Sequence, residues 1–205
     1  MNVNAIEMVI KVAKRLDDKK LMNAFEGNVS LKEDGFIYIT PSGKNKAWLT
    51  PEMICVFDET GNQVSGIYPP SSELPMHTNV YLMRDNIGGV IHSHAPFLTA
   101  YALCAKALES RAHAELLWDH KIIEVVPYGR PSTEAIFAGV KPVLDKGRDT
   151  MLLGNHGVLA VGEDVVDAMN KLESVENAAK ISVISTLIGK QHDLPDDEVT
   201  ALLSF

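Results

Sequence analysis

The stretch GGVIHSHAPFLTAYA, residues 88–102, joins a short apolar run to a proline and a second apolar segment. The first part, 88–95, predicts a buried strand, and the residues after Pro96 predict a helix. Residues two apart in a strand project to the same side, which places the imidazoles of His92 and His94 next to each other. Such a pair is either a hydrogen-bonded pair of core histidines or half of a metal site, and the pair alone does not decide between them.

The rest of the chain mixes strand and helix patterns without a regular strand–helix–strand order. Helices are expected over 4–16, 74–83, 97–108, 132–146, 163–188 and after Pro195. Strands are expected over 27–40 as a hairpin with Asp34-Gly35 at its turn, 53–57, 88–95, 121–129, and 150–162 as two strands. We therefore predict an α/β fold: one domain over residues 1–205, built as a sandwich around a mixed, mostly antiparallel sheet.

Composition and charge narrow the classes of function. The chain has 205 residues, 46% of them apolar and 22% charged, as in ordinary globular domains. Its formal charge of −8 argues against nucleic acid or an acidic membrane as a partner. Its apolar runs are shorter than a membrane helix needs, and its N-terminus lacks the pattern of a secretory signal. Two cysteines in apolar contexts do not predict a disulfide framework, so we expect a cytoplasmic protein.

A third histidine changes the interpretation of the first two. His156 lies between Asn155 and Gly157, in a tight turn between two expected strands, which can hold a side chain rigidly outward. Taken alone it would be an ordinary turn histidine. Three histidines with an open position are typical of catalytic zinc, whereas structural zinc is usually closed by a fourth ligand and often uses thiolates. The remaining histidines are expected to be structural or solvated: His77, His113, His120 and His192.

Glu73 has two interpretations. It follows Ser71 and Ser72 at the expected start of a helix. A first-turn acid complements the helix dipole and contributes about 0.3–1 kcal/mol, and position alone favours that role. The alternative is a carboxylate beside the metal that acts as a general base.

Three turns rich in Gly, Asn and Ser complete the set of candidate features. They are EGNVS (26–30), TPSGK (40–44) and PPSSE (69–73). Each could donate backbone N–H or hydroxyl hydrogen bonds to an anion, although the same residues dominate turns of every kind. Combined with three imidazoles, they indicate a site for a phosphorylated, oxygen-rich substrate.

The ordered set G-N-x-S, T-P-S-G, S-S-E, H-x-H and N-H-G, spread over about residues 5–190, resembles the class II aldolase/adducin family. The resemblance implies an α/β/α sandwich and a zinc ion, or another divalent metal such as Mn²⁺ or Co²⁺. It also implies a homotetramer with active sites between subunits. The implied activity is reversible cleavage of a ketose 1-phosphate, such as L-fuculose 1-phosphate. The products would be dihydroxyacetone phosphate and a short aldehyde, formed through a metal-stabilised enediolate.

The family's functional positions carry over residue by residue. The metal ligands are expected to be His92, His94 and His156, and Glu73 matches the catalytic acid/base. The phosphate-contacting positions are expected to be Gly27, Asn28, Ser42, Gly43, Ser71 and Ser72. Thr40 and Lys44 are adjacent and receive no role.

The sequence also departs from the family's fuculose-phosphate aldolases. These carry a tyrosine in the connection after the H-x-H helix and another in the C-terminal tail, but RAHAELLWDHKIIEV (111–125) and ALLSF (201–205) contain none. Glu26 replaces the small residue usual before Gly-Asn. Glu115 falls near a position where the family's epimerases carry a catalytic aspartate, but we favour a solvated charge there. These departures leave the aldehyde half of the substrate open.

Three alternatives follow from the resemblance. An L-ribulose-5-phosphate 4-epimerase shares the chemistry, but epimerases of this family carry Asp where this chain has Glu73. An aldolase of salvage metabolism acting on a 5-deoxypentulose 1-phosphate shares the dihydroxyacetone phosphate half and is not separated by sequence. A non-catalytic module like the adducin head would lack the metal histidines, which this chain retains.

Overall fold

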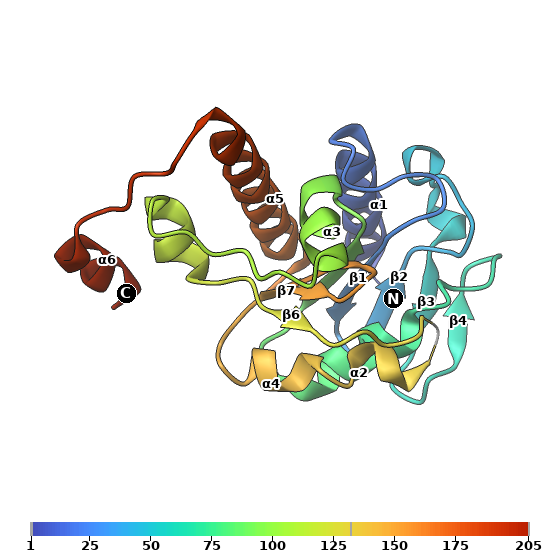
Figure 1. The fold of residues 1–205 in the computed structure, drawn as a ribbon. Coiled ribbons are helices and arrows are strands. Elements are labelled where there is room, and N and C mark those ends of the chain that lie inside the picture. Colours follow the sequence, from blue (N-terminus) through green and yellow to red (C-terminus); the bar gives the residue numbers. More distant parts are fainter. Residues whose placement is uncertain (1, 132, 205) are drawn as a thin grey trace.

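The computed structural model describes residues 2–131 and 133–204, and its helices cover both faces of a central sheet (Figure 1). One face carries α1 (Val3–Asp18), α3 (Pro96–Leu103) and α5 (Val165–Ile188). The opposite face carries α2 (Leu74–Met83) and α4 (Val140–Leu144). This three-layer arrangement confirms the predicted α/β/α sandwich.

The sheet has eight strands in the order β4-β3-β2-β1-β5-β8-β7-β6. Their bounds are β1 (Asn28–Glu33), β2 (Phe36–Ile39), β3 (Cys55–Phe57), β4 (Gln63–Ser65), β5 (Gly89–Ser93), β6 (Val125–Val126), β7 (Thr150–Leu153) and β8 (Gly157–Gly162). Neighbouring strands are antiparallel except for β6 and β7, which are parallel. The prediction of a mixed, mostly antiparallel sheet is therefore confirmed, although the sequence interpretation missed β4.

The central strand β5 determines which face carries the candidate site. It lies between β1 and β8, and all five of its residues are buried. Ile91 packs into the core beneath α1, α3 and α5, whereas Val90 packs into the core beneath α2 and α4. Because side chains alternate along a strand, His92 points to the same side as Val90. It therefore faces the layer in which α2 begins.

Three predicted elements are shorter or broken. The helix expected over 97–108 ends at Leu103, and Ala105 takes a left-handed φ of 48°. The strand expected over 121–129 is reduced to β6 at Val125–Val126 and an isolated bridge between Ile123 and Leu108. The helix expected over 132–146 is divided into a 3₁₀ turn, η4 (Glu134–Phe137), and α4; its expected first residue, Ser132, lies outside the described residues.

The division at Gly139 has a steric reason and a chemical one. A Cβ at Gly139 would stand 3.0 Å from Cδ of Pro127 and 3.0 Å from Cβ of Val126, so the chain passes the strand very closely there. Pro142, inside α4, has no N–H to donate and is tolerated only in the first turn of a helix. A continuous helix through this segment is therefore disfavoured.

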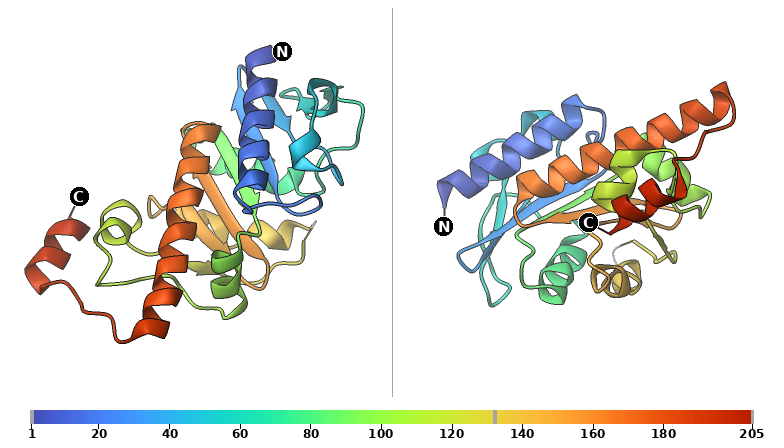
Figure 2. Two further views of the ribbon diagram at one scale, coloured as in Figure 1. Left: turned by 90° about the horizontal axis from the view of Figure 1, so that it is seen from above. Right: turned by 90° about the vertical axis from the view of Figure 1, so that its left-hand side faces the viewer.

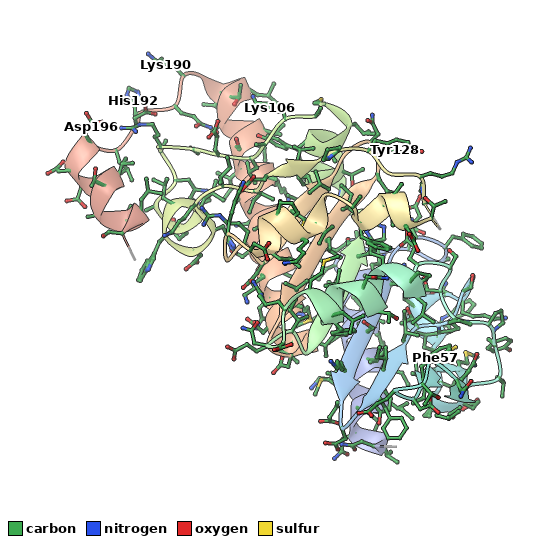
Figure 3. All side chains as sticks on the ribbon, turned by 90° about the horizontal axis from the view of Figure 1, so that it is seen from below. Phe57, Lys106, Tyr128, Lys190, His192 and Asp196 are labelled. Atoms are coloured by element: carbon green, nitrogen blue, oxygen red, sulfur yellow. The ribbon has the colours of Figure 1, made fainter. Side chains whose placement is uncertain are left out.

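The C-terminal part extends away from the sheet. Helix α5 projects beyond the strands, and the chain then returns as α6 (Asp196–Leu203) beside the π-helical turn η3 (Leu116–His120) (Figure 2). Lys190, His192 and Asp196 lie on this extension, at the opposite end of the molecule from Phe57 in β3 (Figure 3). Among the described residues, no helix combines the length and apolar character needed to cross a bilayer.

Candidate active site

The three predicted metal histidines meet where strands of the centre of the sheet end. His92 lies near the end of β5, His94 follows the last residue of that strand, and His156 occupies the turn between β7 and β8. One ligand atom from each residue lies within 4.8 Å of the others. The ring centroids are 4.5–4.9 Å apart. Residues distant in sequence thus form one cluster, as the motif order led us to expect.

Hydrogen bonding and burial favour the neutral, metal-binding form of His92, and burial does the same for His156. His92 Nδ1 donates to the carbonyl oxygen of Val158 at 3.0 Å, so its Nε2 carries the lone pair, and this atom lies 3.0 Å from His94 Nε2. Burial, followed by the nearby His156 and His94, lowers the pKa of His92 well below its usual value. Burial also lowers the pKa of His156, although Glu73 opposes the shift. Metal binding requires this deprotonated form.

Two further observations indicate that the histidine cluster can hold a divalent ion. His156 Nδ1 is buried and has no hydrogen-bond partner within the described part of the chain, which calls for a ligand that accepts its lone pair or proton. Ligand atoms around one tetrahedral zinc ion stand about 3.3 Å apart, comparable with the shortest separation in this cluster. Neither thiol competes, because the Cys55 thiol lies beside the carbonyl of Tyr68 and Cys104 lies on the surface after α3.

Gly157 allows the turn to approach the imidazoles. A Cβ at this position would stand 2.5 Å from the carbonyl oxygen of Ser93, 3.1 Å from His92 Cε1 and 3.2 Å from His94 Cδ2. Any side chain here would displace the strand or the two rings. The N-H-G motif is therefore explained by close packing as much as by its histidine.

The carboxylate of Glu73 lies beside the histidines. The residue is buried at the N-cap of α2, but its side chain makes no capping hydrogen bond. Its Oε2 accepts a hydrogen bond from Asn28 Nδ2 at 2.8 Å and lies 3.4 Å from His92 Nε2. Its Oε1 lies 3.7 Å from His156 Nε2. Of the two interpretations of Glu73, the geometry favours a carboxylate at the site over simple helix capping.

A buried chain of hydrogen bonds supports Glu73 from behind. Asn28 Oδ1 pairs with His77 Nε2 at 2.5 Å, and His77 Nδ1 pairs with the Ser30 hydroxyl at 2.7 Å. The hydroxyl of Tyr81 completes the chain at 2.7 Å from Ser30 Oγ. Burial lowers the pKa of His77 to about 3, so its ring is neutral.

We gave His77 no role in the site from sequence. The spacing of residues could have indicated such a role. His77 lies four residues after Glu73, on the same face of the helix, and Asn28 and Ser30, two residues apart in β1, point to the same face of the sheet.

The six predicted phosphate positions line one cavity of about 180 Å³ together with Glu73, His94 and His156. Those positions are Gly27, Asn28, Ser42, Gly43, Ser71 and Ser72. A β-bridge between Pro41 and Pro70 holds two of the turns side by side. The amides of Ser42 and Ser71 donate to Pro69 and Thr40 within this scaffold. Those two amides are therefore occupied, and the donors left to the cavity are hydroxyls and other turn amides.

Two charged residues that received no site role from sequence also line this cavity. Glu26 is exposed, and its Oε1 lies 3.8 Å from His94 Nδ1. Lys46 is buried, with 2% of its surface exposed. Lys44, by contrast, lies over the ring of Tyr68 with Nζ 3.7 Å from the centroid. Glu115 lies 3.5 Å from His113, outside this cavity.

Comparisons with known proteins agree with the sequence motifs. Residues 7–183 match the family model described as Class II Aldolase and Adducin N-terminal domain. An L-fuculose phosphate aldolase of Methanococcus maripaludis is 34% identical over 176 residues, covering 85% of this chain and 94% of the relative. A 5-deoxy-D-ribulose 1-phosphate aldolase of Bacillus thuringiensis is 28% identical, covering 96% and 92%. A solved structure of an L-fuculose 1-phosphate aldolase superposes with a TM-score of 0.89 at 30% identity, covering 100% and 96% of the two chains.

Proposed function

The chain belongs to the family of class II aldolases and adducin N-terminal domains, and from this premise we propose that it reversibly cleaves a ketose 1-phosphate to dihydroxyacetone phosphate and a short aldehyde. Class II aldolases are lyases, and relatives that bear sugar-phosphate aldolase names cover most of the chain. The observation that carries the proposal is the single cavity in which His94, His156 and Glu73 meet three donor-rich turns. Such a cavity suits a substrate with a phosphate at one end and chelating oxygens at the other.

We propose that His92, His94 and His156 hold a divalent cation, with zinc as the first candidate and Mn²⁺ or Co²⁺ as alternatives. A cation bound there supplies Lewis acidity for the negative charge that develops on the substrate when the carbon–carbon bond breaks. The chain's own contribution is to hold the three rings together and, by burial, to favour the neutral form of His92 and His156. The Val158 carbonyl also fixes the tautomer of His92.

Glu73 is proposed to move the proton. Its Oε2 is engaged by Asn28, whereas Oε1 has no hydrogen-bond donor among the described residues. We therefore assign proton removal and return to Oε1. The Asn28 amide keeps the carboxylate oriented during both steps, because it donates only to the other oxygen.

The phosphate of the substrate is proposed to bind against Gly27, Asn28, Ser42, Gly43, Ser71 and Ser72. The backbone supports this assignment, since Gly27 and Gly43 take φ values of +79° and +63° that turn the chain sharply at the cavity. Successive turn amides of this kind form anion-binding concavities.

A panel of phosphorylated ketoses tests the reaction. Metal-loaded protein is incubated with L-fuculose 1-phosphate, 5-deoxyribulose 1-phosphate and L-ribulose 5-phosphate, and dihydroxyacetone phosphate is measured with a coupled dehydrogenase. Release from either 1-phosphate supports the aldolase and identifies its aldehyde half. Interconversion of pentulose phosphates without fragmentation would establish the epimerase instead. Protein treated with a chelator is the control, and undiminished turnover there would remove the metal from the proposal.

The protein is also proposed to form a homotetramer with active sites between subunits. The exposed C-terminal end of α5 supports an assembly, because large apolar side chains collect there: Ile181, Ile184, Leu187 and Ile188 are 43%, 42%, 82% and 83% exposed. Sedimentation measures the assembly directly. A stable monomer that retains full activity would exclude sites shared between subunits.

A further inference from the structure

Lys46 is a buried cation in the wall of the candidate site. It is the first residue of η1 (Lys46–Trp48) and has 2% of its surface exposed. Among the described residues, it is the only lysine or arginine that is buried. It lines the cavity together with the turn residues Ser42, Gly43, Ser71 and Ser72.

The ammonium group of Lys46 feels the opposite charge of Asp17 but has no acceptor in close contact. It makes no hydrogen bond and no ion pair with any part of the chain that the structure describes. Burial lowers its pKa below the usual value, and the carboxylate of Asp17 opposes this shift. By contrast, Lys171, which is only partly buried, pairs with both Asp149 and Asp167. No hydrogen bond or close ion pair satisfies this ammonium, so an anion that enters the cavity would find an available positive charge in its wall.

The carboxylate of Glu73 does not serve as that anion. Its two oxygens are turned to Asn28, His92 and His156. Lys46 belongs to the same chain segment as Ser42 and Gly43, which supply hydroxyl and amide donors. The cavity thus has a carboxylate–imidazole part and a part formed by donors and one cation. The second part has the chemistry of a phosphate-monoester site.

We propose that Lys46 is the charge partner of the substrate phosphate, a role distinct from that of the donor-rich turns. The inference rests on the proposed function only in taking the ligand to be a phosphorylated ketose. The recognition itself requires a phosphate dianion and no turnover. Lys44 provides a matched control two residues away, because its ammonium lies over the ring of Tyr68 and does not line the cavity.

The test compares Lys46→Met with Lys44→Met in the full-length protein. Binding of inorganic phosphate and of dihydroxyacetone phosphate is measured by calorimetry, and thermal stability is measured with and without phosphate. We expect Lys46→Met to bind both ligands at least about tenfold more weakly, because a charge-assisted contact is lost, and Lys44→Met to bind like the wild type. In phosphate-free buffer, Lys46→Met should unfold at a higher temperature than the wild type, because a buried unpaired charge has been removed. In turnover, KM should rise by a similar factor while kcat changes little.

Unchanged phosphate affinity in Lys46→Met, or a lower unfolding temperature without phosphate, would make Lys46 structural and overturn the proposal. If the variant does not fold, the proposal can be tested on the wild-type protein by chemical labelling. Reductive methylation followed by mass spectrometry should show phosphate protecting Lys46 but not Lys44, and equal labelling of Lys46 with and without phosphate would refute the role. The proposed function fails separately. If Lys46→Met binds phosphate more weakly but the wild type releases dihydroxyacetone phosphate from no ketose, the role of Lys46 in phosphate binding stands and the proposed aldolase reaction is wrong.

Discussion

Replacing His77 by leucine tests whether the buried hydrogen bonds behind Glu73 form one directed chain. The direction follows from a single constraint: a carboxylate only accepts, so Asn28 Nδ2 donates to Glu73 and Asn28 Oδ1 must face a donor. His77 Nε2 therefore carries the proton, its Nδ1 accepts from the Ser30 hydroxyl, and Ser30 accepts from Tyr81. Leucine would leave the side-chain oxygen of Asn28 without a donor and the hydroxyl proton of Ser30 without an acceptor, and both residues are buried.

The expected loss follows from those two groups. Each buried polar group left unpaired costs about 1–3 kcal/mol, so His77→Leu should lower the free energy of unfolding by about 4 kcal/mol at pH 7. For a chain of this size, that corresponds to a decrease in Tm of roughly 8–16 °C. Urea unfolding of the metal-free protein measures the difference.

The pH dependence provides the refutation. Burial lowers the pKa of His77 in the folded state to about 3, below its ordinary value of 6.5. The unfolded chain therefore takes up the proton first, and the stability that the neutral ring contributes is present above about pH 6.5 and is lost as the pH falls toward 3. The leucine variant lacks this loss, so the gap between wild type and variant should narrow by about 2 kcal/mol between pH 7 and pH 5. Tyr81→Phe removes one donor and no titrating ring, so its smaller gap should stay constant. A His77→Leu gap that is equally large at both pH values would contradict the assignment.

Two further changes probe the site, and a third tests how α5 holds the start of α3. Glu73→Gln should reduce turnover at least about 100-fold because proton transfer is lost, while the metal content after dialysis stays at the wild-type level; unchanged turnover would remove Glu73 from the mechanism. Gly157→Ala should lower metal affinity, measured by chelator competition, because its Cβ would stand 2.5 Å from the Ser93 carbonyl oxygen; wild-type affinity would show that the turn can move aside. Glu176→Ala should cost about 2 kcal/mol in urea unfolding, because this buried carboxylate accepts two backbone N–H groups in the first turn of α3 at 3.0 and 2.9 Å; a difference below about 0.5 kcal/mol would argue that water replaces it.

The predictable parts of this molecule are those that a short window of sequence specifies. Alternation around His92, the Asp34-Gly35 turn and the long apolar stripe of α5 each depend on neighbours within a few residues, and all three are found in the structure. The histidine cluster was predicted because two of its members are two residues apart in one strand and the third lies in a recognisable turn. The predicted helix over 132–146 is divided in the structure. Gly139 and Pro142 both disfavour a continuous helix, but the helical spacing of the apolar residues outweighed them in the prediction.

The parts that could not be predicted depend on what lies across the sheet. Lys44 and Lys46 are equivalent in sequence, two lysines in one polar turn, yet one lies against an aromatic ring and the other is buried in the cavity wall. Nothing within the segment separates them, because the difference comes from packing against residues far along the chain. His77 is similar: its helix position was predicted, but its partners lie in β1, and the pairing of β1 with β5 brings Asn28 opposite His92.

The groups that define the site share one property: each is unfavourable in the folded protein until a ligand arrives. Three imidazoles are held together with a buried His156 nitrogen unpaired, and the buried Lys46 makes no hydrogen bond or close ion pair among the described residues. Local rules of stability are broken at these positions and obeyed in the surrounding core, a pattern expected where function, and not folding, selects the residue. Ligands that bind only the folded state convert such groups into stabilising ones. The imidazoles and Lys46 share no hydrogen bond. The increases in stability produced by a divalent metal and by phosphate should therefore be close to additive. If the two increases were strongly non-additive, Lys46 would lie nearer to the metal than the cavity lining implies.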